Sequence, residues 1–230
     1  MLNKIQHTVL ITGANRGIGL AFATQYAEEG WQVLACCREP SQATALKALT
    51  AKHPNIQMIA LDVADAGAVA ALAKQLAQYN IDVLINNAGV YPHNSTDINA
   101  WLEAFKINSI APMVVSHAFA PHVARSALKK IATLSSKMGS VDDNTSGGSY
   151  SYRSSKAAVN MVMKSVAIDL KPQGISVVTL HPGWVQTDMG GSNALINTQT
   201  SVAGMRQVIA NLNLDNTGRF IAFDGKEIAW

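Results

Sequence analysis

Short apolar runs alternate with longer alanine-rich stretches along the chain. The runs are rich in Val, Ile and Leu, and their apolar residues are consecutive rather than alternating with polar ones, which is typical of strands covered by helices on both faces. They occupy residues 7–12, 32–37, 56–61, 81–85, 130–134, 175–181 and 220–223. The pattern predicts buried strands at these seven places.

The stretches between the runs have helical composition. They cover residues 17–29, 41–52, 65–79, 97–124, 151–171 and 201–212. In the third stretch Val69, Leu72 and Leu76 recur at the spacing of one buried helix face. Pro112 interrupts the fourth stretch, and we expect a kink or break there because proline lacks a backbone donor and clashes with the preceding turn.

The alternation of strand and helix favours a parallel sheet with right-handed crossovers. We therefore expect one domain over residues 1–230, an α/β fold with a Rossmann-type doubly wound sheet in the strand order 3-2-1-4-5-6-7 and helices on both faces. Ligands of such sheets bind at the carboxyl ends of the strands. Residues 139–149, rich in Gly, Ser, Asp and Asn, are expected to form a loop near that edge.

Composition narrows the classes of function. Apolar residues make up 48% and charged residues 14% of the 230 residues, which indicates an ordered globular protein. The formal net charge is +3 and the basic residues are scattered, so no nucleic-acid partner is expected. No apolar run approaches the length of a membrane span, so no membrane partner is expected either.

The two cysteines and the first residues bear on the cellular compartment. Cys36 and Cys37 are adjacent, and neighbours on a strand point to opposite faces, so we expect two reduced core residues rather than a disulfide. Residues 1–8 lack the apolar core and cleavage site of a signal peptide. A cytoplasmic location is therefore expected. The six histidines lack metal-site spacing, and no metal is expected.

A glycine-rich turn follows the first predicted strand and opens the first predicted helix. Glycine allows a sharp turn and a close approach to a pyrophosphate, which then lies at the N-terminus of the helix. Three glycines are a weak signal alone, but this position between strand and helix is the one that the mechanism requires. The turn residues expected to contact a dinucleotide are Gly13, Asn15, Arg16, Gly17, Ile18 and Gly19.

Tyr152 and Lys156 are four residues apart on a predicted helix, which places them on one face. Reduction of a carbonyl leaves an alkoxide that needs a proton, and an ammonium near a phenol is expected to lower its pKa toward neutrality. Tyr152 is the one tyrosine of the five with lysine at this spacing. Tyr150 is its nearest competitor, with an expected place in the pocket wall.

These motifs together resemble the short-chain dehydrogenase/reductase family, over nearly the full chain. The turn matches that family's T-G-x-x-x-G-x-G, and Asn86-Asn87-Ala88-Gly89 after the fourth strand matches its N-N-A-G. L-S-S-x-M-G-S, H-P-G-W-V-Q-T-D-M-G-G and a D-G-K near Trp230 resemble the small carbonyl-reductase-like branch of C-factor and sniffer proteins. The resemblance implies a seven-stranded Rossmann core and a homodimer or homotetramer.

The resemblance also implies the catalytic set Ser136, Tyr152, Lys156 and Asn108. Ser136, chosen over Ser135, would polarise the substrate oxygen, and Asn108 would hold a water leading to Lys156. The other implied cofactor contacts are Asp62, Val63, Asn87, Ala88, Gly89, Pro182, Gly183, Val185 and Thr187, besides Tyr152 and Lys156. Plain structural alternatives exist for several: Asp62 can start a turn or helix, and Pro182-Gly183 can be an ordinary turn.

The end of the second strand bears on the choice of cofactor. An acid there bonds the ribose 2′-hydroxyl of NAD, whereas a base accommodates the 2′-phosphate of NADP. Arg38 stands at this place, and Arg16 could share the phosphate. The sequence thus predicts NADP(H) in preference to NAD(H). The alternative is that both arginines are solvated and Glu39 holds a ribose.

The predicted function is an NADP-dependent oxidoreductase that transfers a hydride between NADP(H) and a small-molecule carbonyl or alcohol. One alternative is an NADP-binding signalling or regulatory protein, which the C-factor resemblance suggests. Another is a sugar-nucleotide epimerase or dehydratase, which resembles longer chains with an extra C-terminal domain. Residues 189–200 are expected to form a lid that orders on binding.

Overall fold

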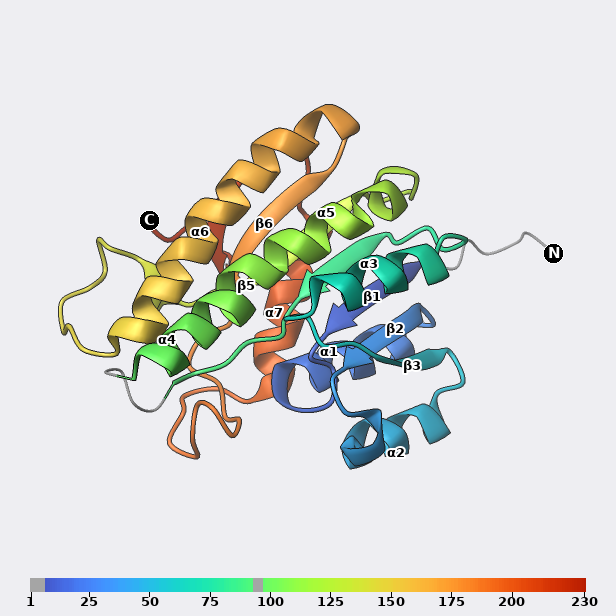
Figure 1. The fold of residues 1–230 in the computed structure, drawn as a ribbon, viewed down its shortest axis with the longest axis horizontal. Coiled ribbons are helices and arrows are strands. Elements are labelled where there is room, and N and C mark those ends of the chain that lie inside the picture. Colours follow the sequence, from blue (N-terminus) through green and yellow to red (C-terminus); the bar gives the residue numbers. More distant parts are fainter. Residues whose placement is uncertain (1–6, 93–96) are drawn as a thin grey trace.

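The computed structural model describes residues 7–92 and 97–230. Within them the chain forms a parallel sheet of seven strands in the order β3-β2-β1-β4-β5-β6-β7, flanked by helices on both faces (Figure 1). The strands are β1 Thr8–Thr12, β2 Gln32–Cys37, β3 Ile56–Ala60, β4 Val83–Asn86, β5 Lys130–Leu134, β6 Ser176–His181 and β7 Arg219–Ala222. Both the α/β class and the strand order predicted from the sequence are confirmed.

The helices divide between the two faces. The front face in Figure 1 carries α3, α5 and α6 side by side, with α4 against α6, and the other face carries α1 and α7. Their bounds are α1 Gly17–Glu28, α2 Thr44–Lys52, α3 Ala66–Gln75, α4 Ile98–Phe105, α5 Ala111–Ala124, α6 Tyr150–Leu170 and α7 Thr198–Ala210. None of the helices in the described ranges is both long and apolar enough to cross a membrane.

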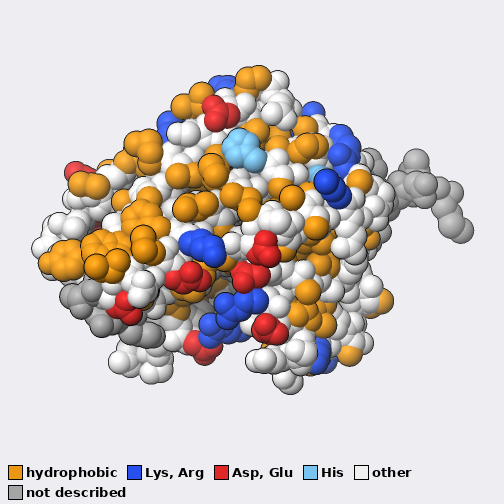
Figure 2. Space-filling view, in the orientation of Figure 1, with side chains coloured by type: hydrophobic (Ala, Val, Ile, Leu, Met, Phe, Trp, Pro, Cys, Tyr) orange, Lys and Arg blue, Asp and Glu red, His pale blue; other side chains and the backbone are white. Residues whose placement is uncertain are grey.

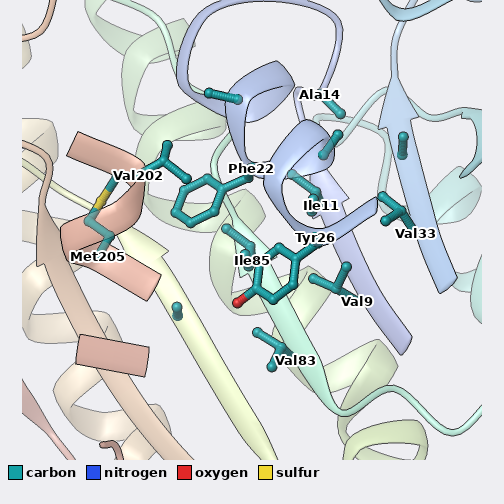
Figure 3. Packing of buried hydrophobic residues seen from close by; sticks show 14 of the residues in the cluster. Val9, Ile11, Ala14, Phe22, Tyr26, Val33, Val83, Ile85, Val202 and Met205 are labelled. Carbon is teal, nitrogen blue, oxygen red and sulfur yellow. The ribbon is translucent and has the colours of Figure 1, made fainter. Parts of the chain in front are cut away.

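Each face of the sheet has its own hydrophobic cluster. In the cluster of Figure 3, Phe22 of α1 and Met205 of α7 pack over Val9 and Ile85 of the central strands. The opposite face buries Leu10 and Leu84 against α3, α5 and α6. The period of two along each strand explains this division, because successive side chains point to opposite faces.

The adjacent cysteines follow the same rule. Cys37 lies in the cluster on the α1 side and Cys36 in the cluster on the α3 side. Both are free and buried. The predicted opposite placement of the two thiols is confirmed.

The predicted helical stretches form with shifted ends. The apolar face of Val69, Leu72 and Leu76 is buried as expected. The helix α3 begins after Asp65, whose carboxylate accepts a hydrogen bond from the backbone N–H of Ala68. Stretch 41–52 is divided into a short 3₁₀ turn, Pro40–Gln42, and α2.

The break expected near Pro112 takes the form of a π-helical turn, Lys106–Ile110, between α4 and α5. Pro112 lies in the first turn of α5, where its missing N–H costs little. Such turns inside helices occur often at functional sites. The turn buries Asn108, one of the predicted site residues.

Acidic and basic side chains are interspersed on the face that Figure 2 shows, rather than gathered into a patch of one sign. The expectation about a secretion signal rests on residues 1–8, of which residues 1–6 lie outside the described part of the chain.

Candidate active site

The predicted functional segments follow the carboxyl ends of β1, β4, β5 and β6. These strands are neighbours and run parallel, so their ends meet at one edge of the sheet. The order reverses beside β1, between β1 and β4, which is the usual position of a ligand crevice in a doubly wound sheet. The site can therefore be described strand by strand.

The turn after β1 requires glycine at three positions for two reasons. Gly13 and Gly17 have φ values of 65° and 53°, in the left-handed region that side chains disfavour. Gly19 is packed so closely that a Cβ there would lie 2.2 Å from the carbonyl oxygen of Gly13. Asn15 and Ile18 are half-buried between them.

Helix α1 starts directly from this turn. Its N-cap residue, Arg16, makes no side-chain hydrogen bond to the first turn. The first backbone N–H groups and the positive end of the helix dipole are thus accessible to an anion. The turn has the properties that a pyrophosphate site needs.

The N-N-A-G segment after β4, residues 86–89, is hydrogen-bonded to the glycine turn after β1. The side-chain amide of Asn87 donates to the carbonyl oxygens of Thr12 and Gly13 at 2.8 and 3.0 Å. The Thr12 hydroxyl accepts from the backbone N–H groups of Asn87 and Ala88. Asn87 therefore sets the shape of the turn from the neighbouring strand.

Two serines end β5, and they differ in their surroundings. Ser135 is buried and its hydroxyl donates to Oδ1 of Asn160 at 2.6 Å. Ser136 is partly exposed, accepts from the backbone N–H of Met138, and lies close enough to the Tyr152 phenol to favour a lower pKa of that phenol. Of the two, Ser136 is the accessible one, and its contact with a substrate stays a prediction.

Tyr152 and Lys156 lie one turn apart on α6, and both are buried. The Lys156 ammonium is 5.7 Å from the centre of the Tyr152 ring, and it donates to the carbonyl oxygen of Leu134 at 3.0 Å. Burial lowers the pKa of Lys156 to about 8, because a charged amine is poorly solvated there.

The pKa of Tyr152 shifts in the direction opposite to the one expected. Burial raises it to about 12, and the hydrogen bond with Ser136 offsets this only in part. The sequence-based expectation that Lys156 lowers this pKa is wrong for this structure. Burial sets the direction of the shift, and the Lys156 ammonium, which donates to the Leu134 carbonyl oxygen, does not offset it.

Asn108 ties three segments together at the π-helical turn. Its Oδ1 accepts from the backbone N–H of Val90 at 2.8 Å, and its amide donates to the Val90 carbonyl oxygen and to Ser155 Oγ. A Cβ at Gly89 would lie 3.2 Å from Asn108 Oδ1 and 3.7 Å from Lys156 Nζ. The side chain is therefore committed to structure, and a water-holding role would fall to the backbone.

Arg38 and Arg16, the two arginines predicted to bind the 2′-phosphate of NADP, differ in the residues that they contact. Arg38 is exposed after β2 and has no hydrogen bond or ion pair with any other residue that the structure describes. Arg16 pairs with Asp188 at 2.6 Å, and both side chains are mostly exposed. Such a pair contributes only about 0–1 kcal/mol. A dianionic phosphate can therefore replace Asp188 as the partner of Arg16 at little cost.

The residues after β3 also have local roles. The Asp62 carboxylate accepts from the backbone N–H of Ala64 at 2.9 Å, which forms a turn of the kind that the structural alternative for Asp62 predicts. Val63 packs against the hydrophobic cluster on the α3 side. An adenine contact by these two residues stays a prediction.

The segment after β6 rests on the glycine turn. A Cβ at Gly17 would lie 3.3 Å from the Thr187 methyl group. Gly183, after Pro182, has a φ of 85°, and Val185 is buried and paired with Ile196. The segment therefore lies against the glycine turn, and contacts of Pro182, Gly183, Val185 and Thr187 with a dinucleotide stay a prediction.

The expected lid is organised by its own hydrogen bonds. The Trp184 indole donates to the Gly190 carbonyl oxygen at 2.7 Å, and the Gln186 amide donates to the Ala194 carbonyl oxygen. The segment therefore has a defined shape in this structure, and ordering on binding stays a prediction.

Tyr91 is a residue of this site that the sequence analysis did not single out. Its ring centre is 4.6 Å from that of Tyr152. The one sequence signal was its position, two residues after Gly89 at the carboxyl edge of the sheet. Nothing in the sequence shows that the two rings meet.

His181, at the end of β6, is a second unexpected member. Its Nδ1 accepts from the backbone N–H of Lys137 at 3.2 Å, so the ring is neutral. Burial, assisted by the charge of Lys137, lowers its pKa to about 4, against the opposing effects of Asp143 and Asp224.

This shift predicts a loss of stability in acid. Between pH 6.5 and about 4 the unfolded chain binds a proton at His181 that the folded protein does not, so the free energy of unfolding falls as pH drops. His181→Asn keeps an acceptor for Lys137 and removes the titration. We expect the loss between pH 7 and pH 4.5 to be smaller in this variant, by on the order of 2–3 kcal/mol. Urea unfolding at both pH values measures the difference, and equal pH dependence in the two proteins would contradict the assignment.

Comparisons with known proteins agree with this geometry. The family model described as short chain dehydrogenase matches residues 7–199. A protein named C-signal from Myxococcus xanthus is 44% identical over 70% of this chain and 99% of its own length.

Two solved structures resemble the whole described fold. A carbonyl reductase from chicken fatty liver with bound NADPH has a TM-score of 0.91 and 36% identity, covering 98% of this chain and 99% of its own. The carbonyl reductase Sniffer of D. melanogaster has a TM-score of 0.89 and 33% identity, covering 98% and 100%. With the family model matching most of its length, the chain belongs to the short-chain dehydrogenase/reductase family.

Proposed function

We propose that the protein is an NADP(H)-dependent carbonyl reductase, which transfers a hydride between the cofactor and a small carbonyl or alcohol. The observation that carries the proposal is the buried pair of Tyr152 and Lys156, one turn apart on α6, with Ser136 near the phenol and a close-packed glycine turn at the same edge of the sheet. Two carbonyl reductases share the fold over their full length, and one of them was solved with NADPH.

The residues present fit the cofactor. The turn is held compact because side chains at Gly13 and Gly19 would collide with Asn87, Ala88 or the turn itself, and the start of α1 has no side-chain cap on its N–H groups. Arg38 has no competing partner among the described residues, and Arg16 has only an exposed one. Lys156 and Tyr152 would meet the nicotinamide ribose, as the family resemblance implies.

When bound, the reduced nicotinamide supplies the hydride to the carbonyl carbon. The Ser136 hydroxyl and the Tyr152 phenol donate hydrogen bonds to the carbonyl oxygen, where negative charge develops. Tyr152 then gives its proton to that oxygen as general acid. Lys156, one helical turn from Tyr152 on α6, would hold the cofactor ribose and so keep the reacting groups beside the phenol.

The high pKa of Tyr152 bears on the direction of the reaction. With a pKa of about 12 the phenol is protonated at neutral pH, which is the form that a general acid needs. Oxidation of an alcohol needs the phenolate as base, which is scarce at pH 7. We therefore propose that the protonated phenol serves as the acid in carbonyl reduction near neutrality.

Arg38 is expected to determine the preference for NADPH. Arg38→Ala should raise the Kd for NADPH by about 10–100-fold, because hydrogen bonds to a charged group contribute roughly 1.5–3 kcal/mol. The Kd for NADH should stay within about twofold, since NADH lacks the 2′-phosphate. Fluorescence titration measures both constants. Lys52→Ala, which removes an exposed charge on α2, controls for the net charge. An equal loss for both cofactors would contradict this role.

The test of the proposed function is oxidation of NADPH and of NADH, followed at 340 nm with a panel of aldehydes, ketones and quinones. Turnover with NADPH in preference to NADH is the expected result. Absence of turnover with every carbonyl, together with tight NADPH binding, would overturn it.

A second candidate is an NADP-binding signalling protein. The observation in its favour is the 44% identity to a protein named C-signal. A binding protein has no need of the Ser136, Tyr152 and Lys156 arrangement, so this candidate ranks second. It predicts NADPH binding without measurable reduction in the same panel.

We also keep the cytoplasm and a homodimer or homotetramer as proposals. The two free thiols suit a reducing compartment. Light scattering coupled to size-exclusion chromatography tests the oligomeric state.

A further inference from the structure

Tyr91 links the loop after β4 to the helix that carries the proposed general acid. It follows the N-N-A-G segment, and its ring packs against the Tyr152 ring with 4.6 Å between centres and 47° between planes. Its hydroxyl makes a 2.9 Å hydrogen bond with Ser149 Oγ. One side chain thus contacts α6 at two points, three residues apart.

The second contact is at the start of α6. Ser149 is the N-cap residue of this helix, yet its side chain makes no capping bond to the first turn. Its φ of 46° lies in the left-handed region, which is uncommon for a residue with a side chain. The bond to Tyr91 therefore fixes a helix terminus that lacks its usual side-chain cap.

The first contact restrains the phenol itself. Tyr152 can place its hydroxyl on the substrate oxygen only in a narrow range of ring orientations, and a tilted aromatic neighbour limits that range. The surroundings of Tyr152 support the pairing, because the nearby Tyr91 contributes to the raised pKa of Tyr152.

We infer that Tyr91 is a positioning residue for Tyr152, which it holds through ring packing and through its hydrogen bond to Ser149. The inference rests on the proposed function, because it concerns the same proton transfer. It predicts that Tyr91 acts on turnover and not on cofactor binding.

The experiment compares Tyr91→Leu, which removes both contacts, with Tyr91→Phe, which keeps the ring. In Tyr91→Leu we expect kcat to fall about 10–100-fold, since a small misplacement of a reacting group can cost about 100-fold. The Kd for NADPH and the KM for the carbonyl should stay within about twofold. Tyr91→Phe should recover most of the turnover. Tyr79→Phe, which loses a hydrogen bond to Gln57 on another part of the surface, is the matched control.

A double-mutant cycle tests the hydrogen bond. Tyr91→Phe and Ser149→Ala each remove the hydrogen bond, so the double variant should have the same kcat as the less active of the two single variants. Losses of kcat that add up in the double variant would overturn the role of the hydrogen bond.

If Tyr91→Leu raised KM and left kcat unchanged, Tyr91 would line the substrate pocket instead of positioning Tyr152, and the inference would fail. Loss of turnover in Tyr91→Phe equal to that in Tyr91→Leu would also overturn the role of the ring. Wild-type protein without any turnover would instead count against the proposed function, so the two failures are distinguishable.

Discussion

Tyr152→Phe is expected to lower kcat for NADPH-dependent carbonyl reduction by about 10³-fold. General acid catalysis contributes roughly 10²–10⁴-fold, and the same hydroxyl is also one of two donors to the developing oxyanion. Phenylalanine keeps the buried ring and its packing on Tyr91, so the fold should be unchanged. The Kd for NADPH should stay within about threefold, because the lost hydroxyl is one contact among many.

Tyr150→Phe is the matched control for this experiment. Tyr150 lies two residues earlier on the same helix, but its side chain is exposed, with 61% of its surface accessible, whereas that of Tyr152 is 8% accessible. We expect turnover within about threefold of wild type for the control. Steady-state kinetics at saturating NADPH separate kcat from KM. Near-normal turnover of Tyr152→Phe would remove the proposed mechanism and leave the fold and family untouched.

The fold could be predicted from the sequence because the strands of this sheet are buried on both faces. Consecutive apolar runs that alternate with helical stretches fit few architectures besides a parallel α/β sheet, and the right-handed crossovers restrict the order of its strands. The opposite placement of Cys36 and Cys37 follows from the same geometry. Helix ends were less predictable at the C-terminal side: α3 begins after Asp65, where the predicted stretch 65–79 starts, but it ends already at Gln75.

The sequence was enough to locate the candidate site residues at the ends of the strands, but it was not enough to predict the pKa values of those residues. Strand ends and motif positions were enough to select Ser136 and Tyr152, which lie near each other in the structure, and their catalytic roles stay predictions. The pKa of Tyr152 depends on burial, which neither the Tyr-to-Lys spacing nor the composition reveals. The contact with Tyr91 depends on two loops from different strands, and the pairing of Arg16 with Asp188 joins residues 172 positions apart. Long-range contacts between loops leave no periodic pattern in a sequence.

Gly19→Ala is expected to raise the Kd for NADPH by more than about 50-fold and to lower the melting temperature. A Cβ at this position would lie 2.2 Å from the Gly13 carbonyl oxygen and 2.5 Å from Nδ2 of Asn87. Neither atom can withdraw freely, because the amide of Asn87 is bonded to Thr12 and Gly13, and these bonds define the turn. Overpacking of this kind typically costs about 1–3 kcal/mol, which corresponds to roughly 2–12 °C for a chain of this size.

Gly67→Ala provides the comparison, because Gly67 lies in the first turn of α3, far along the chain from the glycine turn, and its Cβ would meet only Oδ1 of the N-cap residue Asp65, at 3.2 Å. This variant should bind NADPH like wild type and lose less stability than Gly19→Ala, since the helix propensity of alanine, about 1 kcal/mol better than that of glycine, offsets the close contact with the capping carboxylate. Thermal unfolding with and without NADPH measures both effects in one series. If Gly19→Ala had a lower melting temperature than wild type but the same NADPH-dependent increase in melting temperature, Gly19 would be needed only for packing and not for cofactor binding. Loss of the NADPH-dependent gain in melting temperature, beyond the shift of the unliganded protein, would instead tie the close packing of Gly13, Gly19 and Asn87 to the cofactor, because only a turn of this shape leaves the helix N-terminus open to a pyrophosphate.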